Sequence, residues 1–164
     1  MAIKKLVNFL SLSPFELHQE LAWLTGCPKL HDMNKVRGYI FSRPFMGERV
    51  PQHVQNLVLR DYCERNRLHY LLSATEYAIG DCHLILEQVL CELLDIDGIV
   101  AYSLFQLPED AAHRKRIFSQ VAELQKTMYF AVEGLQVRSH QDCERIETLW
   151  RIRQTLPKCS LIYA

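Results

Sequence analysis

Four runs of mostly apolar residues alternate with helix-like segments along the chain, and this alternation constrains the fold more than any other feature. The runs are residues 36–41, 68–75, 98–104 and 127–132, and the segments with helical spacing that follow them are 52–66, 81–94, 108–125 and 140–156. Continuously apolar strands that alternate with helices are typical of a parallel sheet buried on both faces. We therefore predict an open α/β domain with right-handed crossovers, in which helices cover both faces of a mostly parallel sheet.

The number of strands and the helix ends follow from local signals. Residues 160–163 add a short edge strand to the four runs, so the prediction is four to five strands. Asp81 is the expected N-cap of the second of these helices, and Pro108 lies at the start of the third. Pro157 is expected to stop the last helix, because proline lacks the N–H that a helix interior requires.

The N-terminal part of the chain carries a separate helix signal. Ser13 is a plausible N-cap and Glu16 follows three residues later, as in a capping box, so residues 13–24 are predicted to be helical. We divide the chain into an N-terminal helical extension, residues 1–35, and a single α/β domain, residues 36–164.

Composition excludes several classes of function. The chain has 164 residues, with 19 Lys and Arg against 19 Asp and Glu, and so no net charge. Proteins that bind nucleic acid usually carry a basic excess, so a nucleic-acid partner is not expected. The apolar run near the N-terminus is too short to span a membrane, which leaves a cytoplasmic location as the expectation. The six cysteines show no metal-site spacing and no nucleotide fingerprint is present, so neither a metal nor a cofactor is expected.

Each of the four predicted strands ends in or near a polar side chain, and these are Ser42, Glu76, Ser103 and Glu133. Because the carboxyl ends of parallel strands meet at one edge of a sheet, we expect the four side chains to converge on a binding site there. Ser42, Glu76 and Glu133 are the candidate catalytic residues, and Ser103 a candidate ligand-binding residue. A glutamate that caps the next turn is an equally good interpretation of Glu76.

The loop and helix after the first strand supply most of the remaining candidates. Arg43 and Arg49 suit an anionic group, since a guanidinium can pair two oxygens at once. Further ligand-binding candidates are Gln52, His53 and Gln55 in the helix and Tyr77 after the second strand. The alternative is that Ser42 caps a loop, that Arg43 lies on the surface, and that His53 is merely exposed.

Four blocks carry a family resemblance: GYIFSRPFMGERVPQHVQNLVLRDYC, LLSATEY, GIVAYSLFQLP and YFAVEG. In this order they resemble the sporadic carbohydrate cluster protein family of bacteria. The resemblance covers residues 36–147 and implies genes among those for surface-polysaccharide synthesis, without a known reaction.

A second resemblance concerns the fold. The order of elements is similar to the catalytic domain of serine recombinases (resolvases), whose first strand ends in the nucleophilic serine, here Ser42. The recombinase arginines are missing, because Phe41, Cys82 and residues 105–109 stand where they are expected. The resemblance therefore implies a shared fold and a plausible homodimer, and it argues against strand transfer on DNA.

Three functional hypotheses follow. The leading one is a protein of carbohydrate biosynthesis that binds an anionic sugar or nucleotide-sugar at the strand ends, with catalysis left open. The second is a non-catalytic partner of a glycan-biosynthesis enzyme. The third is a degenerate resolvase-like domain that binds nucleic acid.

Overall fold

The structure, a computed structural model, describes residues 33–45, 47, 49–77 and 82–159. Residues 34–164 belong to one compact unit. Its strands and helices, in chain order, are β1 Lys35–Phe41, α3 Gln52–Arg65, β2 His69–Glu76, α4 Leu84–Cys91, β3 Gly98–Ala101, α5 Ala111–Glu123, β4 Thr127–Phe130, β5 Leu135–Val137 and α6 His140–Cys159. Two short 3₁₀ helices, η2 Glu92–Leu94 and η3 Leu104–Gln106, lie between them.

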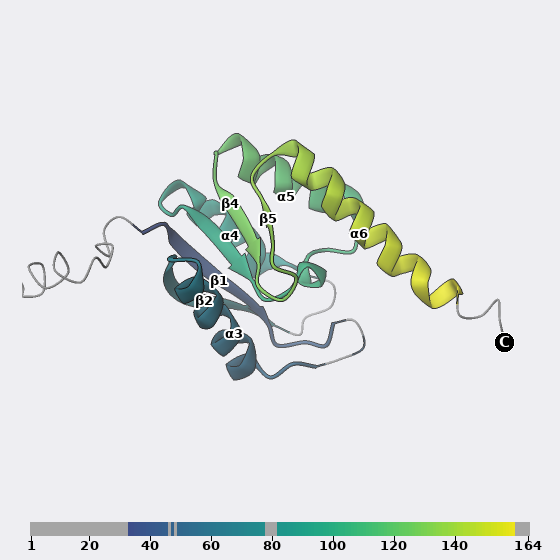
Figure 1. Cartoon of the computed structure of the whole chain (residues 1–164), viewed down its shortest axis with the longest axis horizontal. Helices are drawn as coiled ribbons and strands as arrows, with labels where there is room; N and C mark the ends of the chain where they lie inside the picture. Colours follow the sequence, from purple (N-terminus) through teal and green to yellow (C-terminus); the bar gives the residue numbers. More distant parts are fainter. Residues whose placement is uncertain (1–32, 46, 48, 78–81, 160–164) are drawn as a thin grey trace, which may run out of the picture. The chain divides into compact units, whose positions relative to one another are not determined.

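The sheet has five strands in the order β2-β1-β3-β4-β5 (Figure 1). The first four strands of this order are parallel, and β5 is antiparallel to β4. The predicted α/β fold with a mostly parallel sheet is thereby confirmed.

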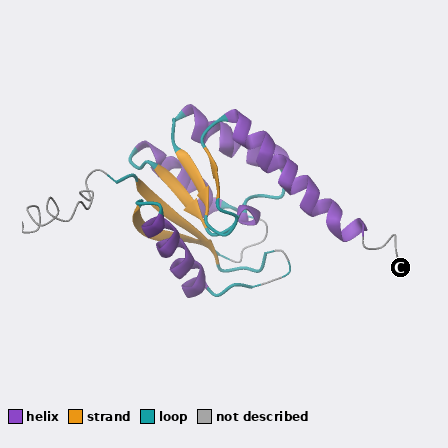
Figure 2. Cartoon of the chain, in the orientation of Figure 1, coloured by secondary structure: helices purple, strands orange, loops and turns teal. Residues whose placement is uncertain are grey.

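Helices cover both faces of this sheet (Figure 2). On one face, side chains of α4, α5 and α6 bury a large core around Phe118 and Phe130. On the other face, α3 buries a smaller core in which Leu59 and Cys63 meet Val100 and Tyr129. The central strands β1 and β3 are apolar along almost their whole length because both of their faces are covered.

Several predicted boundaries were wrong. The third strand ends at Ala101, because Ser103 begins the 3₁₀ helix η3 instead of continuing the strand. The strand β5 was missed, since it has three residues and follows a tight turn in which Gly134 has a φ of +63°. Helix α6 continues through Pro157 to Cys159. A proline this close to the helix end removes only one backbone hydrogen bond.

The helix starts are also corrected. Asp110 caps α5 by accepting a hydrogen bond from the amide of His113, so this helix begins after Pro108. Asp81, the predicted helix 13–24 and the predicted strand 160–163 lie outside the described residues. Within the described part of the chain, no helix combines the length and the apolar character needed to cross a membrane.

Candidate functional site

The carboxyl ends of β1 and β2 are fastened to each other by Ser42. Both its amide nitrogen and its hydroxyl lie 2.9 Å from the carbonyl oxygen of Glu76 and donate to it. The hydroxyl is therefore held by a backbone acceptor, and no hydrogen bond joins it to any described histidine or carboxylate that would take its proton.

Glu76 is buried, with 3% of its surface exposed, at the N-terminus of α4. Its Oε2 accepts hydrogen bonds from the amides of Ile85 and Leu86, each at 3.1 Å, and from the Tyr39 hydroxyl, also at 3.1 Å. The residue at the cap position, His83, makes no side-chain cap bond, so Glu76 caps the helix from a neighbouring strand. Burial and the adjacent Glu76 raise the pKa of Tyr39, which keeps its hydroxyl protonated as a donor.

Gln55 is fully buried in α3 and fixes the end of β1. Its Oε1 accepts from the Phe41 amide at 3.0 Å, while its Nε2 donates to the carbonyls of Phe41 and Val50, both at 2.8 Å. The side-chain nitrogen of Gln106 also donates to Oε1 of Gln55, at 2.8 Å. The bonds to Phe41 and Val50 hold the two ends of the loop that follows β1, and the bond from Gln106 joins α3 to η3.

Ser103 and Glu133 form a second capping unit. The Ser103 hydroxyl donates to Oε1 of Glu133 at 2.6 Å, and Oε2 of Glu133 accepts from the Leu104 amide at 3.0 Å. The Ser103 oxygen also accepts from the amide of Phe105. This unit starts the 3₁₀ helix η3 and ties the end of β3 to the turn after β4.

Arg43 lies against Phe41 and His83. Its guanidinium carbon is 4.5 Å from the Phe41 ring centroid, and its Nη2 is 3.0 Å from Nε2 of His83. A guanidinium can only donate, so Nε2 of His83 is the acceptor of this hydrogen bond. Sequence reasoning missed His83, because nothing in the spacing of residues 43 and 83 shows that they meet.

A line of charged and polar side chains continues from His83. The rings of His83 and His113 lie 6.2 Å apart, and His113 contacts Glu87 at 2.8 Å. Glu87 also accepts from Arg116 at 2.6 Å. Among the described residues, no group of three or more His, Cys, Asp or Glu side chains is placed to hold a metal ion.

The other predicted ligand-binding residues are exposed. Arg49 lies in the loop, Gln52 and His53 in the first turn of α3, and Tyr77 after β2. In the described part of the chain, no side-chain hydrogen bond or ion pair holds any of these four residues. The catalytic roles of Ser42, Glu76 and Glu133 and the binding roles of the others stay predictions, and the structure brings Ser42 to Glu76 and Ser103 to Glu133 in two separate units.

Arg114 has a structural position that its sequence context did not reveal. Three consecutive basic residues in a helix, such as Arg114, Lys115 and Arg116, are usually solvated, but Arg114 is buried, with 2% of its surface exposed. It pairs with Glu147 through two 2.8 Å hydrogen bonds and lies 4.2 Å above the Trp150 ring. It therefore joins α5 to α6 and is not available to a ligand at the strand ends.

The fold is similar to solved structures of site-specific recombinases. The N-terminal catalytic domain of TP901-1 integrase matches 77% of this chain and 98% of its own length, with 14% identity and a TM-score of 0.55. A resolvase family site-specific recombinase from Streptococcus pneumoniae matches 78% of this chain and 94% of its own length, with 6% identity and a TM-score of 0.52. No protein-family model and no curated protein matches the chain.

These comparisons overturn the leading functional hypothesis. The predicted role in carbohydrate biosynthesis is wrong, because the similar structures are recombinase catalytic domains. The resemblance to the carbohydrate cluster family receives no support from them. The weaker of the two resemblances is the one confirmed, and it concerns the fold: the chain has the α/β fold of serine recombinase catalytic domains.

Proposed function

We propose that this chain is a resolvase-like domain that binds DNA without cutting or rejoining it. The fold supports the proposal, since the similarity extends over 98% of the integrase catalytic domain and not over one βαβ unit alone. The proposal that the chain binds DNA is supported by the distribution of charge on α6. The proposal that it does not cut or rejoin DNA is supported by the contacts around Ser42.

The contacts of Ser42 do not favour strand transfer. Attack on a phosphodiester needs positive groups around the developing charge and a route for the serine proton. Phe41 is buried in the core and Cys82 is half-buried, where a recombinase places arginines. The Ser42 hydroxyl donates to a backbone carbonyl, and Arg114 is paired with Glu147.

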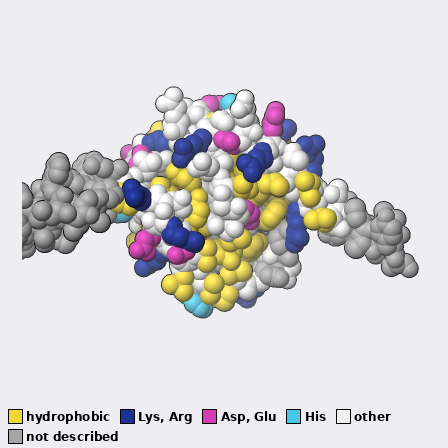
Figure 3. All heavy atoms as spheres, in the orientation of Figure 1, with side chains coloured by type: hydrophobic (Ala, Val, Ile, Leu, Met, Phe, Trp, Pro, Cys, Tyr) yellow, Lys and Arg dark blue, Asp and Glu magenta, His cyan; other side chains and the backbone are white. Residues whose placement is uncertain are grey.

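Helix α6 provides a basic arm. Beyond Trp150 the described side chains, residues 151–156, are all exposed, and the ribbon extends past the sheet (Figure 1). Arg151 and Arg153 are the charged side chains among them, and the sequence contains no Asp or Glu after Glu147. Figure 3 shows Lys and Arg side chains along the side of the molecule that α6 forms.

The absence of net charge sets the expected strength of binding. We first took that balance as a reason against a nucleic-acid partner, but segregation of positive charge onto one arm permits local phosphate contacts. If Arg151 and Arg153 each neutralise one phosphate, the logarithm of the affinity should fall with the logarithm of salt with a slope of about −1.8. Binding of this kind is weak and disappears as salt approaches the physiological range.

Fluorescence anisotropy with a short labelled duplex, measured from low to physiological salt, tests the DNA-binding half. The double variant Arg151→Gln/Arg153→Gln should lose most of the binding and flatten the salt slope. The matched control is Arg65→Gln/Arg67→Gln. It removes the same charge from two exposed positions, the last residue of α3 and a residue just after this helix, and it should bind the duplex like the original chain. Equal losses in both variants, or no binding at low salt, would refute the proposal.

Incubation with supercoiled plasmid tests the non-catalytic half. We expect no nicked product and no covalent protein–DNA species. A covalent species that disappears in Ser42→Ala would show that the serine is a nucleophile after all.

A further inference from the structure

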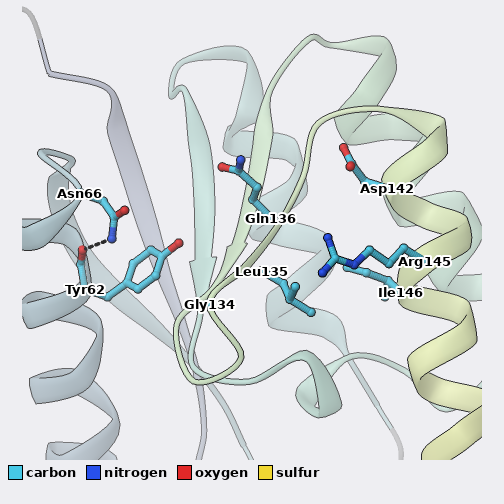
Figure 4. A pocket seen from close by; sticks show the side chains of 8 residues that line it. All are labelled: Tyr62, Asn66, Gly134, Leu135, Gln136, Asp142, Arg145 and Ile146. Atoms are coloured by element: carbon cyan, nitrogen blue, oxygen red, sulfur yellow. Dashed lines mark hydrogen bonds between the residues drawn. The ribbon is translucent and has the colours of Figure 1, made fainter.

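A polar pocket of about 340 Å³ lies between the end of α3, the β4–β5 turn and the first turns of α6. Figure 4 shows Tyr62 and Asn66 entering from α3, Gln136 from β5, and Arg145 from α6 on the opposite side. Its volume is in the range of small-molecule sites. None of its lining residues belongs to the strand-end units around Ser42 and Ser103.

The pocket is lined by one cationic and one anionic side chain, Arg145 and Asp142. Arg145 lines it and forms no ion pair with any described residue. The nearby carboxylate, Asp142, already accepts hydrogen bonds at Oδ2 from the amides of Arg138 and Ser139 and from the Ser139 hydroxyl. These bonds belong to the cap of α6, so the guanidinium of Arg145 is left to pair with an external anion.

The opposite wall offers an aromatic ring and uncharged polar groups. Burial and the neighbouring Tyr129 raise the pKa of Tyr62, so its hydroxyl stays protonated and can donate. Asn66 uses its Nδ2 to reach the Tyr62 carbonyl at 2.7 Å, which leaves its Oδ1 as an acceptor. The Gln136 side chain lines the pocket and makes no hydrogen bond to a described residue, so its amide can both donate to a ligand and accept from one.

A phosphate suits Arg145, and a planar heterocycle with donors and acceptors on its edge suits Tyr62 and the two side-chain amides. We propose that this pocket binds a nucleoside monophosphate, with the phosphate at Arg145 and the base between Tyr62 and Gln136. The proposal is independent of DNA binding by the α6 arm, because Arg151 and Arg153 do not line the pocket.

Isothermal titration of the full chain with AMP, GMP, CMP and UMP tests this proposal. The corresponding nucleosides and inorganic phosphate are titrated separately as controls. We expect at least one monophosphate to bind more tightly than its nucleoside and than phosphate. Loss of a charged hydrogen bond in Arg145→Gln should weaken that binding roughly ten- to a hundredfold. Lys115→Gln makes the same charge change at an exposed position of α5 outside the pocket and should leave the binding unchanged.

Three results would overturn the proposal. They are no binding of any monophosphate, equal binding of inorganic phosphate alone, and equal weakening by Arg145→Gln and Lys115→Gln. Arg145 is exposed, so its substitution does not disturb the core, and circular dichroism of the variant verifies that. Gln136→Ala provides a second measurement, because it should weaken nucleotide binding while leaving any binding of inorganic phosphate as it was.

Discussion

Replacement of Glu76 distinguishes a catalytic carboxylate from a structural one. In the structure its carboxylate is the shared acceptor for the Tyr39 hydroxyl and for two amides at the start of α4. Glu76→Ala removes that acceptor while the three donors remain in a buried place. We therefore expect a large loss of stability, and not the selective loss of an activity.

The magnitude follows from the number of donors left without a partner. Each buried donor without an acceptor costs about 1–3 kcal/mol, so three of them in Glu76→Ala cost roughly 3–9 kcal/mol. Against a total stability of about 5–15 kcal/mol, this variant is at the margin of folding. Glu76→Gln keeps one oxygen and the shape of the side chain, but its NH₂ group faces donors. We expect it to lose about 1.5–3 kcal/mol, comparable to one charged hydrogen bond.

Urea unfolding followed by far-ultraviolet circular dichroism measures these losses. The control is Glu64→Gln, because Glu64 is an exposed glutamate of α3 whose carboxylate makes no hydrogen bond to a described residue. The control should unfold with a free energy within about 0.5 kcal/mol of the original chain. If Glu76→Gln were as stable as this control, the reasoning about a capping carboxylate would be wrong, and a functional role for Glu76 would gain support.

Three other perturbations probe separate parts of the fold. Arg114→Met leaves Glu147 without its buried partner and should lower the free energy of unfolding, measured in urea, by about 3–5 kcal/mol. The control Lys115→Met, at an exposed position of α5, should change that free energy by less than about 0.5 kcal/mol. Similar values for the two variants would contradict the role of Arg114 in joining α5 to α6. Hydrogen bonds from the Arg138 amide and from Ser139 lower the pKa of Asp142, so the stability it contributes is present above the unfolded pKa of about 3.9 and is lost as pH falls through the folded value. The difference in unfolding free energy between the original chain and Asp142→Asn should therefore be about 1 kcal/mol at neutral pH and shrink below about pH 4, and a difference independent of pH would refute the cap. Burial raises the pKa of the Cys63 thiol to about 12, so an aromatic disulfide reagent at neutral pH should modify the exposed Cys91 before Cys63, which should react only on unfolding. Mass spectrometry of the labelled peptides checks this order, and labelling of Cys63 in the folded protein at the rate of Cys91 would contradict it.

The sequence alone determined the fold class of this protein. Most residues of the apolar runs 36–41 and 128–130 are buried in the sheet. A strand of that kind can be predicted from sequence because both of its faces require apolar side chains. Short elements escaped the same reasoning. The strand β5 has three residues, which are too few to show the alternation of apolar and polar side chains that marks a strand. It forms because the turn at Gly134 lets it pair with the edge of β4.

The identity of the strand-end residues was also predictable, whereas their contacts were not. That Ser42, Glu76, Ser103 and Glu133 gather at strand ends follows from the parallel order. Only the tertiary structure shows that Glu76 faces the amides of α4, that Ser103 faces Glu133, and that Arg43 meets His83. These pairs are separated by 9 to 40 residues along the chain. A capping glutamate and a catalytic one look the same in sequence, since the difference lies in which donors the folded chain brings within hydrogen-bonding distance.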